Sequence, residues 1–325
     1  GGLVDELEAA GIRAFGPKKN AAILEGSKAF SKDLMKKYHI PTAAYENFTD
    51  PDKALAYLET AKFPIVLKAD GLALGKGVLI CQNLEEAKEG VKEIMLDKKF
   101  GTAGNEMVVE EFMTGREVSV LSFVDGNTIK TMTSAQDHKR AGDGDTGLNT
   151  GGMGTIAPNP YVTKEVYDAF INGIMNPTLE GIKAEGMNFA GVIFFGLMIT
   201  DKGVYLLEYN MRMGDPETQV VLPLLESDFI ELLESGLKGD LANADVKWSN
   251  KSACCVVLAS GGYPEAYNKG YEITGIDKVD NMVFVAGAKA EDGKLLTSGG
   301  RVLNVVAVGE NLEDARAKAY ADAEK

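Results

Sequence analysis

Apolar residues recur at two alternating spacings along the chain, which predicts a mixed α/β fold. Helical spacing predicts helices over 2–10, 27–40, 50–61, 83–97, 163–185, 226–238 and 311–325. Alternating or continuous apolar runs predict strands over 12–15, 43–48, 63–69, 77–82, 106–112, 116–126, 189–200, 203–210, 253–260, 282–290 and 301–308. Ser27 is a suitable helix N-cap, and Asp201-Lys202-Gly203 is typical of a tight hairpin.

Residues 134–160 do not follow either spacing. The segment "SAQDHKRAGDGDTGLNTGGMGTIAPNP" is long, polar and rich in glycine. A connection of this length inside a compact domain is usually either functional or disordered. Disorder is typically accompanied by low complexity, whereas this segment contains specific acidic, basic and turn residues. We therefore predict a functional loop.

The net charge excludes some classes of function. The chain of 325 residues has a formal charge of −14, and broad nucleic-acid or membrane binding needs a basic surface instead. Anionic small molecules need only a local cluster of lysines, arginines and backbone N–H groups. No apolar run reaches the ~18 residues that a membrane-spanning helix requires. Acidic residues near the start argue against a secretory signal.

Cysteine and histidine are scarce, which limits the chemistry. Cys81, Cys254 and Cys255 form no CxxC pair, so we predict buried, reduced thiols and a cytoplasmic location. Cys254 and Cys255 point to opposite faces if they lie on a strand. With His39 and His138 as the only histidines, a histidine zinc site or a serine triad has little material.

The stretch "KADGLALGKGV" at 68–78 approaches a phosphate-binding P-loop but fails its pattern. Three residues separate Gly71 from Gly75 instead of four, and Gly77 replaces the Ser or Thr that ligates magnesium. The stretch also leads into a strand, so no helix N-terminus faces a phosphate. A glycine flap between antiparallel strands can still close over phosphates, with Lys68 as an inward charge. The alternative is a hairpin with a loose turn.

The stretch "LLEYNMRMGDPETQ" at 206–219 carries a candidate metal site. Glu208 and Asn210 are two apart on a strand, so their side chains share a face. A carboxylate and an amide oxygen suit Mg²⁺ or Mn²⁺ bound together with phosphates. Arg212 continues this face and could neutralise a transferred phosphoryl group. A half-exposed strand before a capped helix is the alternative.

Two further segments carry weaker signals. In "VVEEFMTGRE", two acids and an apolar pair could meet an adenine edge, and Glu117 could bind ribose hydroxyls; a solvated strand end is the alternative. In the polar loop, Thr150, Gly151 and Gly152 could present free backbone N–H groups to an anion. A lone histidine such as His138 is more often a structural hydrogen-bonding residue than a catalytic base.

Seven motifs, in this order, resemble those of ATP-grasp ligases, and more closely those of the phosphoribosylamine–glycine ligase (glycinamide ribonucleotide synthetase) family. They are "LEGSKAFSK", "VLKADGLALGKGV", "VVEEFMTGREVS", "SAQDHKRAGDGDTGLNTGGMG", "LLEYNMRMGDPETQ", "ASGGYPEAYNKG" and "SGGRVLNV". The QDHKR-to-GGMG loop and GDPETQ separate this family from other ATP-grasp enzymes. The resemblance covers nearly the whole chain.

The resemblance implies an α/β (α+β) ATP-grasp fold with four parts. A remnant of an N-terminal Rossmann-like lobe would occupy 1–25, and the lid 43–110. The central catalytic lobe would take 26–42 and 111–247, and a small C-terminal α+β lobe 248–325. The glycine-rich opening of the family is missing here, so the chain resembles one shortened at both ends. The missing opening would affect the binding of phosphoribosylamine more than the binding of ATP.

The implied activity is a two-step, ATP-dependent ligation in purine biosynthesis. Glycine takes the γ-phosphoryl group of ATP, and the amine of 5-phosphoribosylamine then displaces phosphate from glycyl phosphate. The implied cofactors are ATP and Mg²⁺ or Mn²⁺. The implied partners are these small substrates, without nucleic acid or membrane, in a monomer or in a fusion or association with other purine-pathway enzymes.

The resemblance also implies roles for individual residues. The ATP site would include Lys28, Lys68, Gly71, Gly75, Lys76, Gly77, Glu110, Glu111, Phe112, Met113 and Glu117. The metal would be held by Glu208 and Asn210. Catalysis would involve Arg212, Asp137, Lys139 and Asp215. Substrates would be held by His138, Arg140, Asp145, Thr146, Asn149, Thr150, Gly151 and Gly152.

Other interpretations stay open at this point. The chain could be an ATP-binding fragment without turnover, or an ATP-grasp enzyme for another acid and amine, such as a carboxylating relative. The QDHKR loop disfavours the carboxylating relative. A binding module unrelated to ATP is the remaining alternative, which an absence of Mg-dependent ATP binding would favour.

Overall fold

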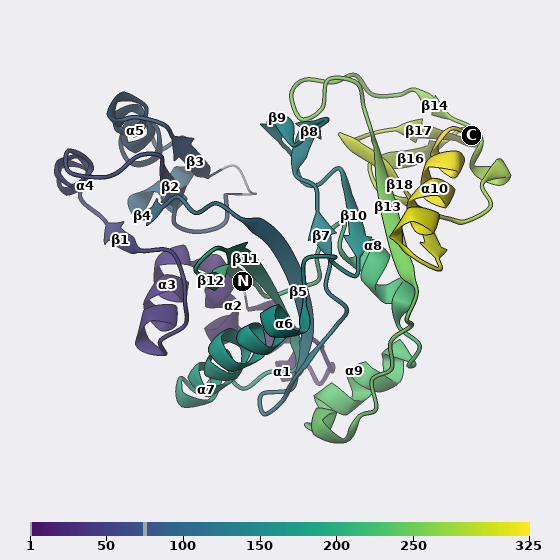
Figure 1. The fold of residues 1–325 in the computed structure, drawn as a ribbon, viewed down its shortest axis with the longest axis horizontal. Coiled ribbons are helices and arrows are strands. Elements are labelled where there is room, and N and C mark those ends of the chain that lie inside the picture. Colours follow the sequence, from purple (N-terminus) through teal and green to yellow (C-terminus); the bar gives the residue numbers. More distant parts are fainter. Residues whose placement is uncertain (1, 74–76) are drawn as a thin grey trace.

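The computed structural model describes residues 2–73 and 77–325 (Figure 1). Its helices are α1 (Leu3–Ala9), α2 (Lys19–Gly26), α3 (Lys28–Lys37), α4 (Pro51–Leu58), α5 (Leu84–Val91), α6 (Lys164–Phe170), α7 (Asn176–Ala184), α8 (Thr218–Val221), α9 (Phe229–Leu237) and α10 (Leu312–Ala323). Short helical turns are η1 (Lys92–Leu96), η2 (Gly101–Asn105), η3 (Ile171–Met175), η4 (Leu222–Leu224), η5 (Leu241–Asn243) and η6 (Ile276–Lys278).

The strands form three main sheets and two small ones. They are β1 (Tyr45–Phe48), β2 (Ile65–Ala69), β3 (Val78–Cys81), β4 (Met107–Glu111), β5 (Arg116–Val124), β6 (Ile129–Thr131), β7 (Gln136–Asp137), β8 (Arg140–Gly142), β9 (Thr146–Asn149), β10 (Gly154–Ala157), β11 (Gly191–Thr200), β12 (Gly203–Asn210), β13 (Ser252–Ala259), β14 (Glu272–Ile273), β15 (Met282–Val285), β16 (Ala288–Glu291), β17 (Lys294–Thr297) and β18 (Arg301–Gly309).

The lid is a four-stranded antiparallel sheet in the order β1-β4-β2-β3, with α4 and α5 on one face (Figure 1). Leu67 and Val109 point into the core beneath these helices. Because side chains alternate along a strand, Lys68 and Glu110 point to the opposite face. That face meets α3 of the central lobe. The strands on either side of the glycine stretch pair antiparallel, as both the flap and the loose-turn interpretation require.

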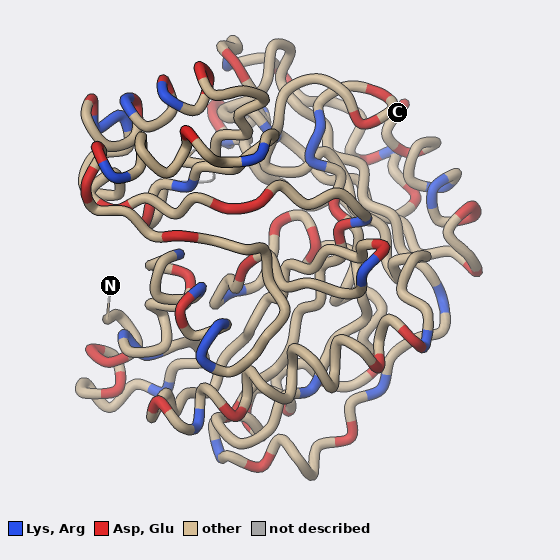
Figure 2. The backbone as a smooth tube through the Cα atoms, turned by 60° about the vertical axis from the view of Figure 1, so that its left-hand side comes forward, with Lys and Arg blue, Asp and Glu red and all other residues tan. Residues whose placement is uncertain are grey.

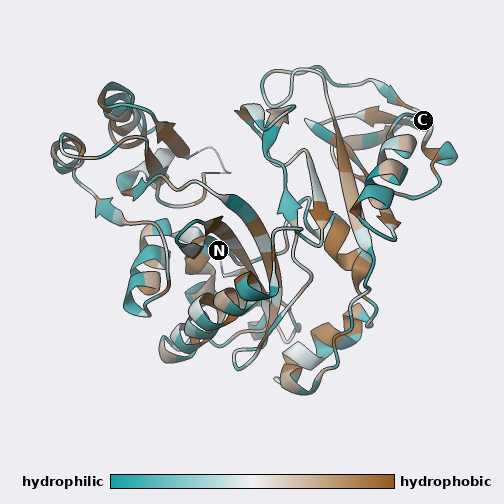
Figure 3. Cartoon of the chain, viewed as in Figure 1, coloured by the Kyte–Doolittle hydropathy of each residue, from teal (hydrophilic) through white to brown (hydrophobic). Residues whose placement is uncertain are grey.

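The central lobe is built on the sheet β12-β11-β5-β6, which is buried on both faces. Phe195 packs into one core with helices α6 and α7, whereas its neighbour Phe194 packs into a second core with α8 and β13. This two-sided burial explains the continuous apolar run of 189–199, which is brown in Figure 3. The hairpin turn at 201–202 lies where the sequence predicts it.

The segment 134–160, which the sequence predicts as a functional loop, contains regular structure. It contains four short strands, β7 to β10, and β8 pairs with β9 as a small exposed hairpin. Strands β7 and β10 continue the C-terminal sheet in the order β15-β18-β13-β10-β7. Strands of two to four residues in a glycine-rich sequence are too short to show a periodic pattern. The boundary expected at 247/248 therefore divides one continuous sheet.

Several smaller expectations meet mixed outcomes. Ser27 caps α3 by accepting a hydrogen bond from the N–H of Phe30 at 3.0 Å, as predicted. Cys254 and Cys255 do lie on opposite faces of β13, in different cores. Segment 12–15 is not a strand, 282–290 is divided between two sheets, and α2 was not predicted. No described helix is long and apolar enough to cross a bilayer.

Candidate active site between the lid and the central lobe

Lysines gather where the lid meets α3. Lys68 lies 2.9 Å and Lys32 lies 3.3 Å from the two carboxylate oxygens of Glu110. Lys28, at the start of α3, donates to the carbonyl of Gly71 at 2.8 Å. Acidic and basic residues are interspersed along the tube in Figure 2, and the chain as a whole is acidic. Three lysines in one place are therefore a local concentration of positive charge.

Glu208 lies on β12 opposite this cluster. Burial alone would raise the pKa of Glu208, but the ammonium groups of Lys68, Lys139 and Lys28 lower it below its usual value. Burial lowers the pKa of Lys28, and Glu208 opposes that effect. The carboxylate and the lysines therefore stabilise one another in their charged forms. Such a site suits an anion that binds together with a metal cation.

Glu208 and Asn210 share a face of β12, because Asn210 Nδ2 donates to Glu208 Oε1 at 3.3 Å. The amide oxygen of Asn210 lies 3.5 Å from Arg212 Nη2. This pair of hard oxygen donors fits a divalent cation such as Mg²⁺. Among the described residues, no group of three or more His, Cys, Asp and Glu side chains could hold a metal. Phosphate oxygens would have to complete the coordination of such an ion.

Arg212 is fixed by a residue that sequence analysis did not select. Glu25, in α2, accepts from Arg212 Nε at 3.0 Å and from the N–H of Met211 at 2.8 Å. Arg212 also donates to the carbonyl of Met213 at 3.1 Å. One carboxylate oxygen of Glu25 thus holds the guanidinium beside Asn210, and the other holds the backbone at the end of β12. Glu25 lies within the motif "LEGSKAFSK", but no role could be predicted for its side chain, because its partner lies more than 180 residues away.

The flap begins at Gly71, whose φ of +94° favours glycine. On the returning strand, a Cβ at Gly77 would approach the Cβ of Ala73 to 2.6 Å. Both glycines are therefore required by the hairpin itself. The remaining flap predictions, Gly75 and Lys76, lie outside the described residues.

The residues predicted at the adenine and ribose lie at the end of the lid. The carboxylate of Glu110 is occupied by lysines, so its side chain is unsuited to an adenine edge. Glu111 accepts from the N–H of Ala44 at 3.4 Å, whereas Phe112 and Met113 are partly buried. Glu117 lies 3.1 Å from the ammonium of Lys139. Partial burial would lower the pKa of Lys139, but the carboxylates of Glu117 and Glu208 raise it above its usual value.

Asp137 faces a second carboxyl group instead of a lysine cluster. Burial, and then the nearby Glu217, raise the pKa of Asp137 to about 7. Burial also raises the pKa of Glu217, whose carboxylate lies 3.4 Å from Ser119 Oγ. Asp137 Oδ1 is buried and has no hydrogen-bond partner among the described residues. A buried, unpartnered oxygen of this kind is a candidate for contact with a substrate.

The expected anion nest at 150–152 is wrong as a set of free donors. The N–H of Thr150 donates to the carbonyl of Lys139 at 2.7 Å, and that of Gly152 donates to Thr150 Oγ1 at 3.0 Å. The N–H of Gly151 donates to the hydroxyl of Tyr263 at 2.9 Å. Internal hydrogen bonds therefore take all three donors, two of them within the polar loop and one with the C-terminal part of the chain.

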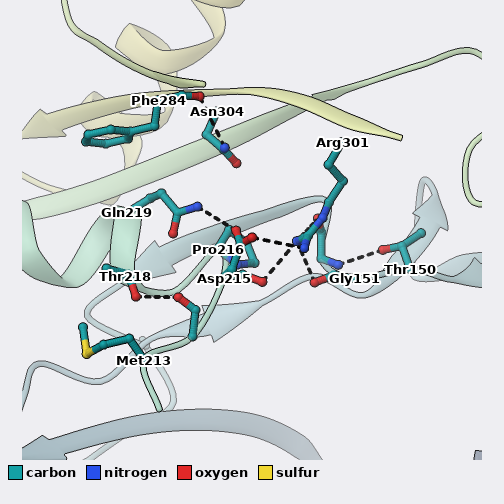
Figure 4. A network of polar contacts seen from close by, with 12 residues as sticks. Thr150, Gly151, Met213, Asp215, Pro216, Thr218, Gln219, Phe284, Arg301 and Asn304 are labelled. Carbon is teal, nitrogen blue, oxygen red and sulfur yellow. Dashed lines mark hydrogen bonds and ion pairs between the residues drawn. The ribbon is translucent and has the colours of Figure 1, made fainter. Parts of the chain in front are cut away.

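Arg301, at the start of β18, also holds the segment 150–152 (Figure 4). Its Nη1 donates to the carbonyls of Gly151 at 2.8 Å and Asp215 at 3.1 Å. Its Nη2 lies 3.3 Å from the carboxylate of Asp215. One guanidinium thus joins the C-terminal sheet to the polar loop and to the turn that follows the metal pair. Only the fold brings these three segments together.

The remaining predicted substrate residues lie around the β8–β9 hairpin. His138 Nδ1 lies 3.1 Å from the carbonyl of Gly154, which favours the structural interpretation of this histidine. Arg140 donates across the hairpin to the carbonyl of Gly147 at 2.9 Å. Asp145, Thr146 and Asn149 are exposed on the hairpin. The structure does not place these three against the lysine cluster.

A cavity of about 470 Å³ lies elsewhere, in the C-terminal part of the chain. Leu258, Ser260, Tyr271 and Thr297 contribute to its lining. No charged side chain lines it, so it lacks the groups that would bind phosphate or a metal ion. The candidate active site is therefore the charged region between the lid and the central lobe.

Comparison with known proteins shows the family of this chain. Residues 26–218 match the family model of the phosphoribosylglycinamide synthetase ATP-grasp (A) domain, and 253–325 match the C domain of the same synthetase. The chain belongs to the phosphoribosylglycinamide synthetase family. A phosphoribosylamine–glycine ligase of Fusobacterium nucleatum is 55% identical over 98% of this chain and 76% of its own length. A bifunctional purine biosynthetic protein of Dictyostelium discoideum is 48% identical, and 43% of it is covered.

Solved structures show the fold of this family. The crystal structure of a phosphoribosylamine–glycine ligase from Thermotoga maritima superimposes with a TM-score of 0.89 at 40% identity, covering 96% of this chain and 78% of that one. The biotin carboxylase domain of a Hydrogenobacter thermophilus 2-oxoglutarate carboxylase gives a TM-score of 0.73 at 18% identity, covering 99% and 70%. The second likeness concerns the fold alone. Both agree with the ATP-grasp fold expected from the sequence motifs.

Proposed function

We propose that this protein is an ATP-dependent carbon–nitrogen ligase that joins glycine to 5-phosphoribosylamine in purine biosynthesis. The products are glycinamide ribonucleotide, ADP and phosphate. Family membership supports the reaction, and the single structural observation that carries it is Glu208 and Asn210 facing the lysine cluster. A polyphosphate with a divalent cation suits that combination of charges.

The lysines and the flap form the ATP half of the site in this proposal. Lys28 and Lys68 would contact the phosphates, and the backbone around Gly71 and Gly77 would close over them. Phe112 and Met113 would line the adenine, with Glu111 at the strand end and Glu117 toward the ribose. Glu208 and Asn210 would hold the cation, which supplies neutralisation of phosphate charge. Mg²⁺ and Mn²⁺ both suit these oxygen donors.

The second half of the site would handle the acyl group and the amine. The glycine carboxylate oxygen attacks the γ-phosphorus, and the bond from γ-phosphorus to the ADP oxygen breaks. The amine nitrogen then attacks the carbonyl carbon of glycyl phosphate, and phosphate leaves. Arg212 lies where it could neutralise the transferred phosphoryl group. Asp137 could accept the proton that the attacking amine loses, because its pKa of about 7 suits proton transfer near neutral pH.

Lys139 and Asp215 would support these groups. Lys139 would hold charge between Glu117 and Glu208, and Asp215 would fix the turn beside Arg301. We propose that the polar loop orients the substrates, through Arg140, Asp145, Thr146 and Asn149 on its hairpin and through His138 and 150–152 at its base. A monomer in the cytoplasm is the proposed setting.

The test is ADP release by the purified protein with Mg-ATP and glycine, with and without freshly made 5-phosphoribosylamine. We expect ADP and glycinamide ribonucleotide, identified by mass, to form together and only with both substrates. ATP binding without turnover would instead favour the ATP-binding fragment. A different amide product would favour another ATP-grasp ligase. An absence of Mg-dependent ATP binding would overturn the proposal.

A further inference from the structure

Glu110 lies between two lysines at the back of the proposed ATP site. The side chains of Glu110 and Lys32 are 3% and 2% exposed, and Lys68 is 11% exposed. A buried carboxylate needs one counter-ion, because an uncompensated buried charge is strongly destabilising. Glu110 has two, so the cluster carries one more positive charge than its own neutrality requires.

The two lysines are attached to different parts of the molecule. Lys32 belongs to α3, and its ammonium donates to Thr42 Oγ1 at 2.5 Å. Thr42 in turn donates to the carbonyl of Leu206 on β12 at 2.6 Å, so the central lobe fixes Lys32. Lys68 lies on the lid strand that leads directly into the glycine flap. The lid strand thus carries one counter-ion of Glu110, and the central lobe carries the other.

The contacts of Glu110 show that Lys32 acts on it as a charge. Glu110 Oε1, the oxygen nearest to Lys32, has no hydrogen-bond partner among the described residues. Lys32 directs its hydrogen bond to Thr42 instead. Burial lowers the pKa of Lys32 to about 8, and Glu110 opposes that effect, so the ammonium form prevails at neutral pH.

We propose that Lys32 is a positioning residue for ATP: it neutralises Glu110 when the phosphates of ATP draw Lys68 away from that carboxylate. This proposal rests on the role of Lys68 as a phosphate ligand. Without Lys32, a Lys68 that moved to phosphate would leave Glu110 buried and unpaired. Lys68 would then stay on Glu110 and bind ATP poorly.

The test measures Mg-ATP affinity by titration calorimetry in the absence of glycine and amine. Lys32→Met should weaken ATP binding by about ten- to hundred-fold, because an unpaired buried carboxylate opposes the release of Lys68. The KM for glycine should change less than about two-fold, since glycine does not compete for Lys68. The matched control is Lys37→Met on the same helix, which breaks an exposed ion pair with Glu185 and should leave ATP affinity unchanged.

The decisive variant is Lys32→Met combined with Glu110→Gln. Removing the carboxylate removes the need for Lys32, so ATP affinity should return to within about three-fold of the unaltered protein. A direct or merely structural role of Lys32 predicts no such recovery. Failure to recover, or unchanged affinity in Lys32→Met alone, overturns the inference while leaving the proposed function intact.

Glu110→Gln alone gives a result that does not depend on the folding of Lys32→Met. It should bind ATP at least as tightly as the unaltered protein, because Lys68 is released from its carboxylate. A ten-fold loss would show that the carboxylate itself contacts the nucleotide, against the proposal. Lys68→Met should weaken ATP binding; unchanged affinity there would overturn both the phosphate role of Lys68 and the inference built on it.

Discussion

Glu208 and Asp137 are partly buried carboxyl groups on the two sides of one site, yet their pKa values are shifted in opposite directions. Lys68, Lys139 and Lys28 lower the pKa of Glu208 despite its burial. Burial and Glu217 raise the pKa of Asp137 to about 7. Burial raises both pKa values, so the balance of neighbouring charges makes the difference: three lysines lower the pKa of Glu208, whereas Glu217 and Lys139 act on Asp137 in opposite directions.

The difference separates two chemical tasks in one site. The lysine side is prepared for a phosphate chain and its cation, where a permanently ionised carboxylate is useful. The Asp137 side offers a group that can gain or lose a proton near neutral pH, as the attack of an amine requires. Each side can therefore be altered separately, and the following experiments do so in decreasing order of expected effect.

Glu208→Gln replaces the ionised carboxylate near Lys68, Lys139 and Lys28 with a neutral amide. We expect a loss of at least about a hundred-fold in turnover, because one charge disappears from a site that must hold a dication. ADP release measures the activity, and circular dichroism checks that the fold is intact. Glu185→Gln, an exposed carboxylate paired with Lys37, is the control. Full activity in Glu208→Gln would disprove the metal assignment.

Gly152→Ala should disturb the Asp137 side sterically. Gly152 has a φ of +119°, and its added Cβ would lie 2.6 Å from Asp137 Oδ1 and from Pro216 Cδ. We expect a loss of about 2 to 3 kcal/mol in the free energy of unfolding, measured with urea. Gly186→Ala shares a positive φ but meets open space, so it should cost about 1 kcal/mol. Equal losses in the two variants would contradict the steric explanation.

Arg301→Lys should loosen the joint between the polar loop and the C-terminal sheet. A lysine cannot replace a guanidinium that reaches Gly151, Asp215 and their carbonyls together. We expect the KM for glycine or the amine to rise roughly ten-fold with ATP affinity unchanged. Steady-state kinetics for each substrate gives the answer, with the exposed Arg316→Lys on α10 as the control. A selective loss of ATP affinity would show that Arg301 acts on the other side of the site.

Asp137→Asn should change how stability depends on pH. The folded pKa of Asp137 is above its unfolded value near 4, so the folded state keeps a proton that the unfolded state releases. Its contribution is fully present below about pH 4 and is lost as the pH rises to about 7, by at most about 1.4 kcal/mol per pH unit. Urea unfolding across this range should show the decline flattened in the Asn variant. An unchanged slope would mean that Asp137 is ionised throughout.

Sequence patterns predicted the long elements well. The apolar run 189–199, the hairpin that follows it and the Ser27 cap depend on contacts within a few residues, so local spacing was informative. The four strands inside 134–160 escaped prediction because glycine and polar residues carry no periodicity there. In addition, β10 pairs with β13, which lies about 100 residues away.

The candidate site divides in the same way. Glu208, Asn210 and Lys68 could be selected because their motifs are continuous in the sequence. Lys32 and Glu25 lie within the motif "LEGSKAFSK", but no role was predicted for them, because the partners that define their roles lie on distant segments. Of the three N–H groups expected to be free at 150–152, that of Gly151 donates to the distant Tyr263, and the other two donate to acceptors within the polar loop.

The sequence by itself determined the fold class, the family and the residue types needed for phosphate and metal chemistry, because these are written in local spacing and short motifs. Only the tertiary structure decided which charges meet. It paired Glu110 with two lysines and left Asp137 beside Glu217. The physical reason is that a buried group takes its charge state from neighbours brought together by folding, and those neighbours are far apart in the chain.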